Sequence, residues 1–288
     1  MTTESLVSIF LPVSLGIIML GFGLSLTTDD FRRVLKYPKS VLVGLLCQMI
    51  LLPMFAFAIC YVFRLSPQLS IGLMILASSP GGVAANIFSH LSHGDVALNL
   101  TLTAINCVLA AFTVPLVVNL SIAHFGGEDV IGLQFRKTIE VFLIVLVPVA
   151  IGMLVRKSRP EFSVKADKPV RIFSMLVLAM ISLVAIVKEK ERLVSSMSDV
   201  GPAMVIFNVG SMGLGYYVAK AFRLNMREAT AITMEVGIHK SALAFYITIT
   251  LLKSFDLAIP AAVYSIVMFF TAGIFSAYLA RKNLHGRL

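Results

Sequence analysis

Nine runs of apolar residues, separated by short polar connections, occupy most of this chain. They lie at roughly 6–27, 39–63, 68–92, 95–121, 138–156, 169–187, 198–220, 228–252 and 257–280. A helix needs about 20 mostly apolar residues to cross about 30 Å of hydrocarbon. Hydrophobic residues make up 58% of the chain and charged residues 14%, against about 45–50% and 25% in soluble domains. The pattern predicts an all-α polytopic membrane protein with about nine transmembrane helices, and it excludes a soluble domain.

The basic residues predict how the chain is oriented in the membrane. If the N-terminus is outside, sixteen of the twenty-four lysines and arginines fall on inward connections, seven fall on outward ones and Lys240 lies within a run. Cytoplasmic connections carry an excess of Lys and Arg. We therefore expect a multi-pass protein of the cell (inner) membrane with its N-terminus outside and its C-terminus cytoplasmic. The same placement explains the net charge of +9 without a nucleic-acid partner.

The three cysteines do not indicate a disulfide framework or a metal site. Cys47, Cys60 and Cys107 all lie inside apolar runs, with no CxxC pair and no histidine cluster nearby. We expect them to be small buried packing residues.

The third run contains Pro80, Gly81 and Gly82 at its centre. Proline lacks an N–H and glycine adopts backbone shapes closed to other residues, so this tripeptide predicts a break in the helix. Backbone groups freed at membrane depth must be covered by protein or by a water-filled cavity. Asn86 follows the break and can both donate and accept hydrogen bonds. A plain proline kink is the structural alternative.

The eighth run has Glu235, Gly237, His239 and Lys240 at its centre. A charge there costs about 2.5–3.5 kcal/mol on insertion scales. Lys240 is about eleven residues, or about 16 Å, from either end of its run, too far for its stem to reach the headgroups. On a continuous helix Glu235 and Lys240 would point about 140° apart, so a structural ion pair requires a break, for which Gly237 is the natural place. The alternative is an ion or substrate site.

Two interrupted apolar runs, one in each half of a chain, indicate the binding site of a secondary transporter. The N-termini of half-helices attract anions, and unwound carbonyls can bind cations. Other polar residues lie within runs: Gln48, Asn99, Thr103, Asn106 and Asn208. The spacing of Asn99, Thr103 and Asn106 places them on one helix face. Taken singly, each favours an interhelical hydrogen bond over a ligand contact.

The chain resembles the bile acid:sodium symporter family, in particular bacterial-type members that lack the first span. The resemblance covers nearly the whole length, and its most specific segments are SSPGGVAANIFSHLSHGDVALNLTLTAIN and TMEVGIHKSALAF. It implies inverted repeats with two crossing discontinuous helices in a single transmembrane domain, residues 1–288. The panel would contain the spans near 6–27, 138–156 and 169–187. The core would contain those near 39–63, 68–92, 95–121, 198–220, 228–252 and 257–280.

The resemblance also implies transport by alternating access. The expected substrate is a small organic anion, such as a bile salt, a steroid sulfate, pantoate or another carboxylate. No cofactor and no catalytic residues are implied, and Na⁺ is the possible coupling ion. We take Asn86, Asn106, Asn208 and Lys240 as candidate substrate-binding residues.

Two sodium sites follow residue by residue from the family. One corresponds to Ala85, Asn86, Asn99, Thr103 and Glu235, and the other to Gln48, Glu235, His239 and the carbonyls of Val236 and Ile238. Ala85 and Asn99 stand where the family has serine or a similar residue. His239 stands where the family has glutamine, and Lys240 where it has asparagine.

The presence of Lys240 predicts that sodium coupling is weakened or replaced. Like charges 4 Å apart at an effective dielectric constant near 20 repel by about 4 kcal/mol, which is about a thousandfold in affinity. Lys240 could act as a tethered cation or as the partner of a substrate carboxylate. The alternatives are a proton-coupled or uncoupled anion carrier and, further off, a non-transporting membrane receptor or enzyme.

Overall fold

The fold is described from a computed structural model of the chain. The structure describes residues 3–126, 135–166 and 190–285, together with 169–170, 172–173, 176 and 180. Most of the predicted span at 169–187 therefore lies outside the described residues. Within the described ranges the backbone is helical apart from connections, and the one β pairing is an isolated bridge between Gly81 and His239. The prediction of an all-α membrane protein is confirmed at this level.

The helices follow the apolar runs closely. In chain order they are α1 (Thr3–Ser25), α2 (Thr28–Arg32), η1 (Arg33–Leu35), α3 (Pro38–Leu46), η2 (Cys47–Leu51), α4 (Leu52–Val62), α5 (Pro67–Ser78), α6 (Val83–Leu91), α7 (Val96–Phe125), α8 (Phe135–Ser158), α10 (Lys190–Ala221), α11 (Met226–Gly237), α12 (Ser241–Phe245), η3 (Tyr246–Leu251), η4 (Asp256–Ala258) and α13 (Ile259–His285). Elements η2 and η3 are π-helical turns.

Four continuous helical stretches among the described residues are long and apolar enough to cross a membrane. They are Pro38–Val62, Val96–Phe125, Lys137–Ser158 and Asp256–Leu279. A fifth candidate is the pair Leu11–Ser25 and Thr28–Leu35, which is bent by 74° at its break. The third and eighth runs are interrupted as predicted, so their half-helices are individually too short to span a membrane.

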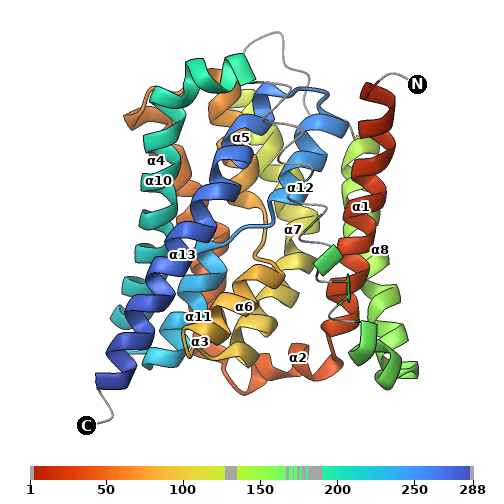
Figure 1. Cartoon of the computed structure of the whole chain (residues 1–288), viewed down its shortest axis with the longest axis vertical. Coiled ribbons are helices and arrows are strands. Elements are labelled where there is room, and N and C mark those ends of the chain that lie inside the picture. The colour runs from red at the N-terminus through yellow and green to blue at the C-terminus, as the bar shows by residue number, and fades with distance from the viewer. Residues whose placement is uncertain are drawn as a thin grey trace.

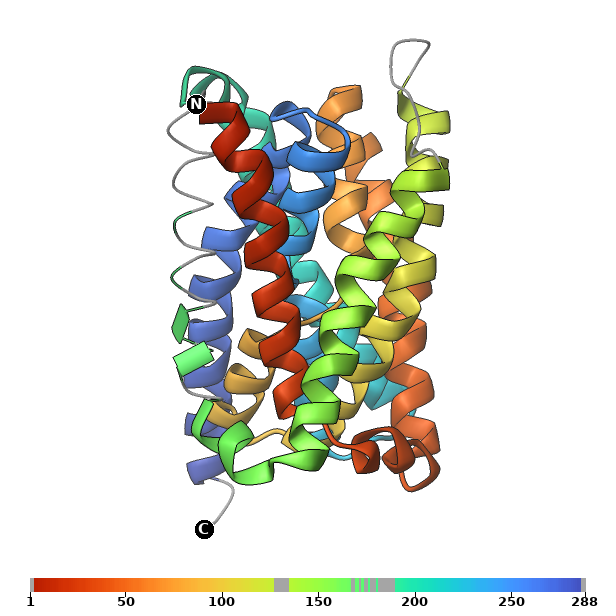
Figure 2. The same cartoon turned by 90° about the vertical axis from the view of Figure 1, so that its right-hand side faces the viewer.

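Helices α1 and α8 pack side by side at one edge of the molecule, and the other helices lie beyond them (Figures 1 and 2). Gly23 on α1 permits this close packing, because an added Cβ would lie 2.3 Å from the carbonyl oxygen of Val149. Helix α1 begins at the end of the molecule opposite to that at which α13 ends (Figure 1). An odd number of membrane crossings follows from this arrangement if both helices span.

Both broken runs place an extended segment between two half-helices. Helix α5 ends at Ser78 because Ser79, which precedes Pro80, takes an extended conformation of the kind that proline imposes on its neighbour. Helix α11 ends at Gly237, and Ile238 is likewise extended. The segments that follow lie near the middle of the molecule (Figure 1), where they form the site described next.

Candidate functional site

The two helix breaks cross and satisfy one another's backbone groups. The N–H of Lys240 donates to the carbonyl of Pro80 at 2.9 Å, and Gly81 pairs with His239 in an antiparallel bridge. Main-chain groups without helical partners are costly in hydrocarbon. The crossing therefore stabilises both breaks together and fixes the relative positions of the side chains around it.

Glu235 lies in the last turn of α11 and is fully buried. Its carboxylate accepts hydrogen bonds from Thr103 Oγ1 at 2.6 Å and from Asn106 Nδ2 at 2.9 Å. Both donors come from α7, on the face that the spacing of Asn99, Thr103 and Asn106 predicted. Hydrogen bonds to a charged group contribute about 1.5–3 kcal/mol each, so these two hold the carboxylate in place.

Gly81 allows the third-run break to approach this carboxylate. A Cβ built on Gly81 would lie 2.5 Å from Glu235 Cδ and Oε2, a distance that real Cβ atoms do not adopt. Any larger residue would displace either the carboxylate or the backbone that pairs with His239. The glycine predicted to break the helix therefore also makes room for Glu235.

Lys240 is 6% exposed and forms no salt bridge with a carboxylate among the described side chains. Its ammonium lies 3.2 Å from Cys107 Sγ and 3.8 Å from Met19 Sδ. It also lies 4.6 Å from the centre of the Phe22 ring, within range of a cation–π interaction. The helix does break after Gly237, as a Glu235–Lys240 pair would require, but the two side chains form no salt bridge.

Gln48 and His239 both bind the end of α5. Gln48 Nε2 donates to the carbonyl of Ser79 at 3.1 Å, and His239 Nδ1 lies 3.1 Å from the same oxygen. Gln48 sits in the π-helical turn η2, a feature often found at functional sites. Gln48 Oε1 and His239 Nε2 are buried and have no hydrogen-bond partner within the described structure.

Asn208 caps the broken end of α11. Its Nδ2 donates to the carbonyl of Gly237 and to the hydroxyl of Tyr264, each at 2.8 Å. Tyr264 in turn donates to the same Gly237 carbonyl at 2.8 Å, and Thr271 donates to Asn208 Oδ1. These contacts make Asn208 part of an interhelical hydrogen-bond network, and its contact with substrate stays a prediction.

The remaining predicted residues surround the same crossing. Asn99 donates to the carbonyl of Ala231 at 2.8 Å, and Asn86 is half-buried and lies 3.4 Å from the carbonyl of Gly82. Ala85 is buried in α6, and Val236 and Ile238 are buried on either side of Gly237. The side-chain oxygens of Asn86, Asn99 and Asn106 have no hydrogen-bond donor within the described structure.

Buried acceptor oxygens without donors indicate what the site can bind. Hard cations such as Na⁺ take carboxylate, amide and carbonyl oxygens, and these are the atoms that the carried-over residues supply. No cluster of three His, Cys, Asp or Glu residues that could hold a metal ion occurs among the described residues. The buried oxygens of Gln48, Asn86, Asn99 and Asn106 are of the type that an alkali cation takes.

Four contact residues were not predicted from the sequence as part of the site. Met19 and Phe22 reach Lys240 from α1, and no periodicity or motif in the first run marks them. Tyr264 was detectable in principle, because a phenol inside an apolar run must find a hydrogen-bond partner when buried. Cys107 was expected to be a packing residue, and it also contacts the ammonium.

Comparisons of the sequence with a family model and with individual known proteins point to the same family. A family model described as the sodium bile acid symporter family matches residues 12–196. The chain is 29% identical over 272 residues to the probable sodium/metabolite cotransporter BASS2, chloroplastic, of Oryza sativa subsp. japonica, covering 94% of this chain and 64% of that protein. It is 26% identical over 276 residues to the uncharacterized sodium-dependent transporter YocS of Bacillus subtilis, covering 96% and 84%.

A more distant relative comes from an animal. The chain is 25% identical over 288 residues to the ileal sodium/bile acid cotransporter of Cricetulus griseus, covering 97% of this chain and 81% of that protein. The chain spans less than two thirds of the rice protein's length but more than four fifths of the bacterial and hamster proteins.

Proposed function

The chain belongs to the sodium bile acid symporter family, and from this membership and the geometry of the crossing we propose that it is a secondary transporter of a small organic anion. The family and the rice, bacterial and hamster relatives carry the names of transporters, not enzymes. The substrate would bind at the crossed breaks near Lys240. It would reach that site from alternate sides of the membrane as one group of helices moves against the other.

The single observation that carries this proposal is the ammonium of Lys240. The backbone N–H of Lys240 donates to the carbonyl of Pro80 and holds the residue at the crossing, and the charge of the ammonium is not cancelled by a salt bridge to Glu235. A buried cation without a carboxylate partner is costly, and an anionic substrate supplies the missing charge. The nearby half-helix N-terminus of α6 adds partial positive charge for the same anion.

The charge of Lys240 also affects which ion could drive transport. In the proposed mechanism its ammonium replaces one of the cations that the family gathers around the carboxylate, so that sodium dependence is weak. Any sodium that binds would still be lined by the residues that the family resemblance supplies. These are Gln48, Ala85, Asn86, Asn99, Thr103, Glu235 and His239, with the carbonyls of Val236 and Ile238. The support is the set of buried oxygens without donors described above.

The proposed topology has nine spans arranged as inverted repeats. The broken pairs α5–α6 and α11–α12–η3 would each serve as one span. Helices α1 and α8 would belong to the panel with the span at 169–187, and the remaining helices would form the core. The contact between Lys240 of the crossing and Met19 and Phe22 of α1 would then cross the boundary between core and panel.

Proton coupling is the second candidate, and one observation favours it. His239 Nε2 is buried without a hydrogen-bond partner in the described structure, so the imidazole has a nitrogen that could take up a proton. In this version His239 and Glu235 exchange a proton with the pathway, and no sodium is needed.

Uptake into proteoliposomes tests the proposal. Radiolabelled pantoate and taurocholate are offered with an inward Na⁺ gradient, an inward H⁺ gradient or neither, and empty liposomes serve as the control. We expect that at least one of the two anions accumulates in the vesicles. This accumulation should persist when choline replaces Na⁺, and it should be lost in the Lys240→Met variant. Chemical turnover of these compounds in detergent, with no vesicular uptake, would contradict the proposal.

A further inference from the structure

The ammonium of Lys240 joins the crossing to α1 through weak contacts. Its nitrogen lies 3.2 Å from Cys107 Sγ, 3.8 Å from Met19 Sδ and 4.6 Å from the centre of the Phe22 ring. Met19 and Phe22 belong to α1 and are fully buried. Thiols and thioethers are weak hydrogen-bond partners, and the aromatic face attracts the cation through its quadrupole. Two sulfur atoms and a ring are thus the partners that the described structure gives this ammonium.

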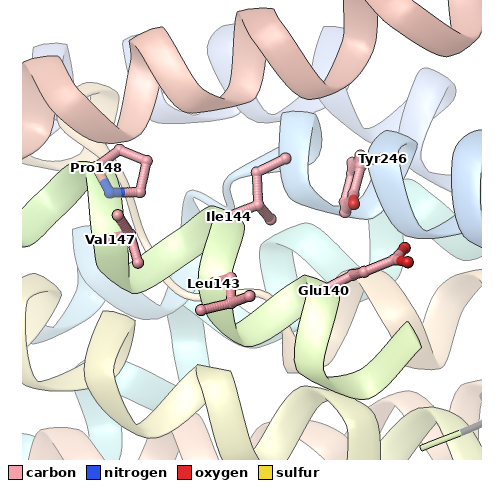
Figure 3. Close-up of a pocket in the computed structure, with 6 residues that line it drawn as sticks. All are labelled: Glu140, Leu143, Ile144, Val147, Pro148 and Tyr246. Carbon is pink, nitrogen blue, oxygen red and sulfur yellow. The ribbon is translucent and has the colours of Figure 1, made fainter. Parts of the chain in front are cut away.

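Helices α1 and α8 meet the second broken run along its length. They form a pair at one edge of the molecule (Figures 1 and 2), and α1 also packs on α12 and η3. Helix α8 faces η3 across a hollow, which is lined by Glu140, Leu143, Ile144, Val147 and Pro148 of α8 and by Tyr246 of η3 (Figure 3). Beyond the hollow, Lys137 Nζ of α8 donates to the carbonyl of Leu251 at 2.6 Å. The α1–α8 pair is therefore tied to α12–η3 near both ends, by Lys240 at the start and by Lys137 at the end.

An anion that binds Lys240 has to compete with α1 for the same ammonium. The ammonium has three N–H donors, and a carboxylate accepts them in short, charge-assisted hydrogen bonds about twice as strong as neutral ones. Sulfur atoms and one ring offer less. Glu235 acts electrostatically on the ammonium but forms no salt bridge with it, because Thr103 and Asn106 hold its carboxylate. We therefore expect the substrate, and not Glu235, to draw Lys240 away from α1.

We propose that the protein exchanges one organic anion for another faster than it moves an anion alone, because the contact of Lys240 with Met19 and Phe22 restrains α1 until an anion takes the ammonium. This inference rests on the proposed transport function and adds the mode of transport to it. A ligand shifts a conformational equilibrium only by binding its states differently, and here the anion does so by replacing contacts that tie α12 to α1.

A cation fixed to the chain makes the return step different from that of a sodium-coupled carrier. Sodium ions can leave the site after the substrate, whereas the ammonium of Lys240 stays and returns to Met19 and Phe22 once the anion has gone. The site then reorients slowly until another anion binds. Phe22 is a positioning residue in this scheme, since it acts on transport through Lys240.

The test is the initial uptake of radiolabelled pantoate and taurocholate into proteoliposomes of the full chain, with or without the same unlabelled anion in the lumen. For at least one compound, we expect the lumenal anion to speed uptake by about threefold or more in the parent. This lies within the range of about 2- to 30-fold that a cation–π contact corresponds to. Phe22→Leu keeps an apolar side chain and removes the ring, so the ratio of the two rates should fall towards one.

Two further variants separate the restraint from general packing. Met19→Leu removes the sulfur atom at similar size, and it should lower the ratio in the same direction as Phe22→Leu. It decides the question if Phe22→Leu fails to fold. Phe112→Leu is the matched control, because Phe112 of α7 packs edge-on against Phe142 of α8, with ring centres 4.9 Å apart. It removes an aromatic contact between the α1–α8 pair and the other helices, so it should leave the ratio unchanged.

The possible outcomes distinguish this inference from the transport function itself. Equal uptake with and without the lumenal anion in the parent would overturn the exchange mode and leave transport in place. A ratio that Phe22→Leu and Met19→Leu both leave unchanged, or that Phe112→Leu lowers equally, would overturn the restraint by α1. If neither compound is taken up under either condition, the proposed transport function is contradicted, and the exchange mode falls with it.

Discussion

The ammonium nitrogen of Lys240 lies 3.2 Å from the thiol sulfur of Cys107. Lys240 belongs to the segment between α11 and α12, while Cys107 belongs to α7, one residue after the Asn106 that binds Glu235. The lysine and the glutamate therefore approach the same stretch of α7 without forming a salt bridge. This arrangement leaves the positive charge available to an anion and keeps the carboxylate on its own hydrogen-bond donors.

Removing the charge of Glu235 should abolish transport while leaving the fold intact. Glu235→Gln keeps the shape of the side chain but weakens the contacts with Thr103 and Asn106, each worth about 1.5–3 kcal/mol when charged. Initial uptake into proteoliposomes should fall by at least about tenfold. Glu161→Gln is the matched control at an exposed site. Near-normal uptake in Glu235→Gln would remove this residue from the mechanism.

Because Gly81 lies so close to Glu235, we expect that adding a single methyl group at Gly81 lowers the stability of the protein. Gly81→Ala places a Cβ 2.5 Å from the carboxylate, and overpacking of this kind costs about 1–3 kcal/mol. Gly16→Ala is the control, because a Cβ on Gly16 meets no atom within 4 Å and alanine favours a helix by about 0.5–1 kcal/mol. Thermal unfolding should show a lower Tm for Gly81→Ala and an equal or higher Tm for Gly16→Ala. Equal Tm values for parent and Gly81→Ala would contradict the packing described.

The cap on the broken end of α11 should contribute to stability. Tyr264→Phe removes the hydroxyl that binds the carbonyl of Gly237, a loss of about 0.5–1.5 kcal/mol for a typical hydrogen bond. Tyr278→Phe changes an exposed tyrosine on the same helix and should have no effect. Denaturation of the two variants in matched detergent measures the difference. An unchanged Tm for Tyr264→Phe would mean that Asn208 alone caps Gly237.

Sequence reasoning located the two helix breaks and the α7 face that contacts Glu235, because the signals for these features are local. Pro80, Gly81 and Gly82 predicted one break and Gly237 the other, and the spacing of Asn99, Thr103 and Asn106 placed two donors on the face that binds Glu235. The contacts of Lys240 were not predictable in this way. Met19 and Phe22 come from a run more than two hundred residues away in the chain, and only the packing of α1 brings them to the ammonium.

The membrane orientation can be checked at two described positions. Helix α5 starts and helix α8 ends at opposite ends of the molecule (Figure 1). Gln68 is exposed in the first turn of α5, and Ser158 is exposed at the last residue of α8. The charge distribution predicts that Gln68→Cys faces outside and Ser158→Cys faces the cytoplasm. A membrane-impermeant maleimide should label the first variant in intact cells and the second only after permeabilisation. The parent is the control, since its three cysteines are buried. Labelling of both variants from one side would contradict the nine-span topology.

The central claim is that Lys240 takes the place of a sodium ion at the crossing, and sodium-dependent thermal stabilisation tests it most directly. The double variant His239→Gln/Lys240→Asn restores the residues of the family pattern and removes the repulsion of about 4 kcal/mol estimated for 4 Å. Unfolding is followed while NaCl replaces choline chloride at constant ionic strength. We predict that Na⁺ leaves the Tm of the parent unchanged and raises that of the double variant by several degrees, since ligands that bind the native state stabilise it. A steep Na⁺-dependent rise in the parent, equal to that in the double variant, would contradict the claim.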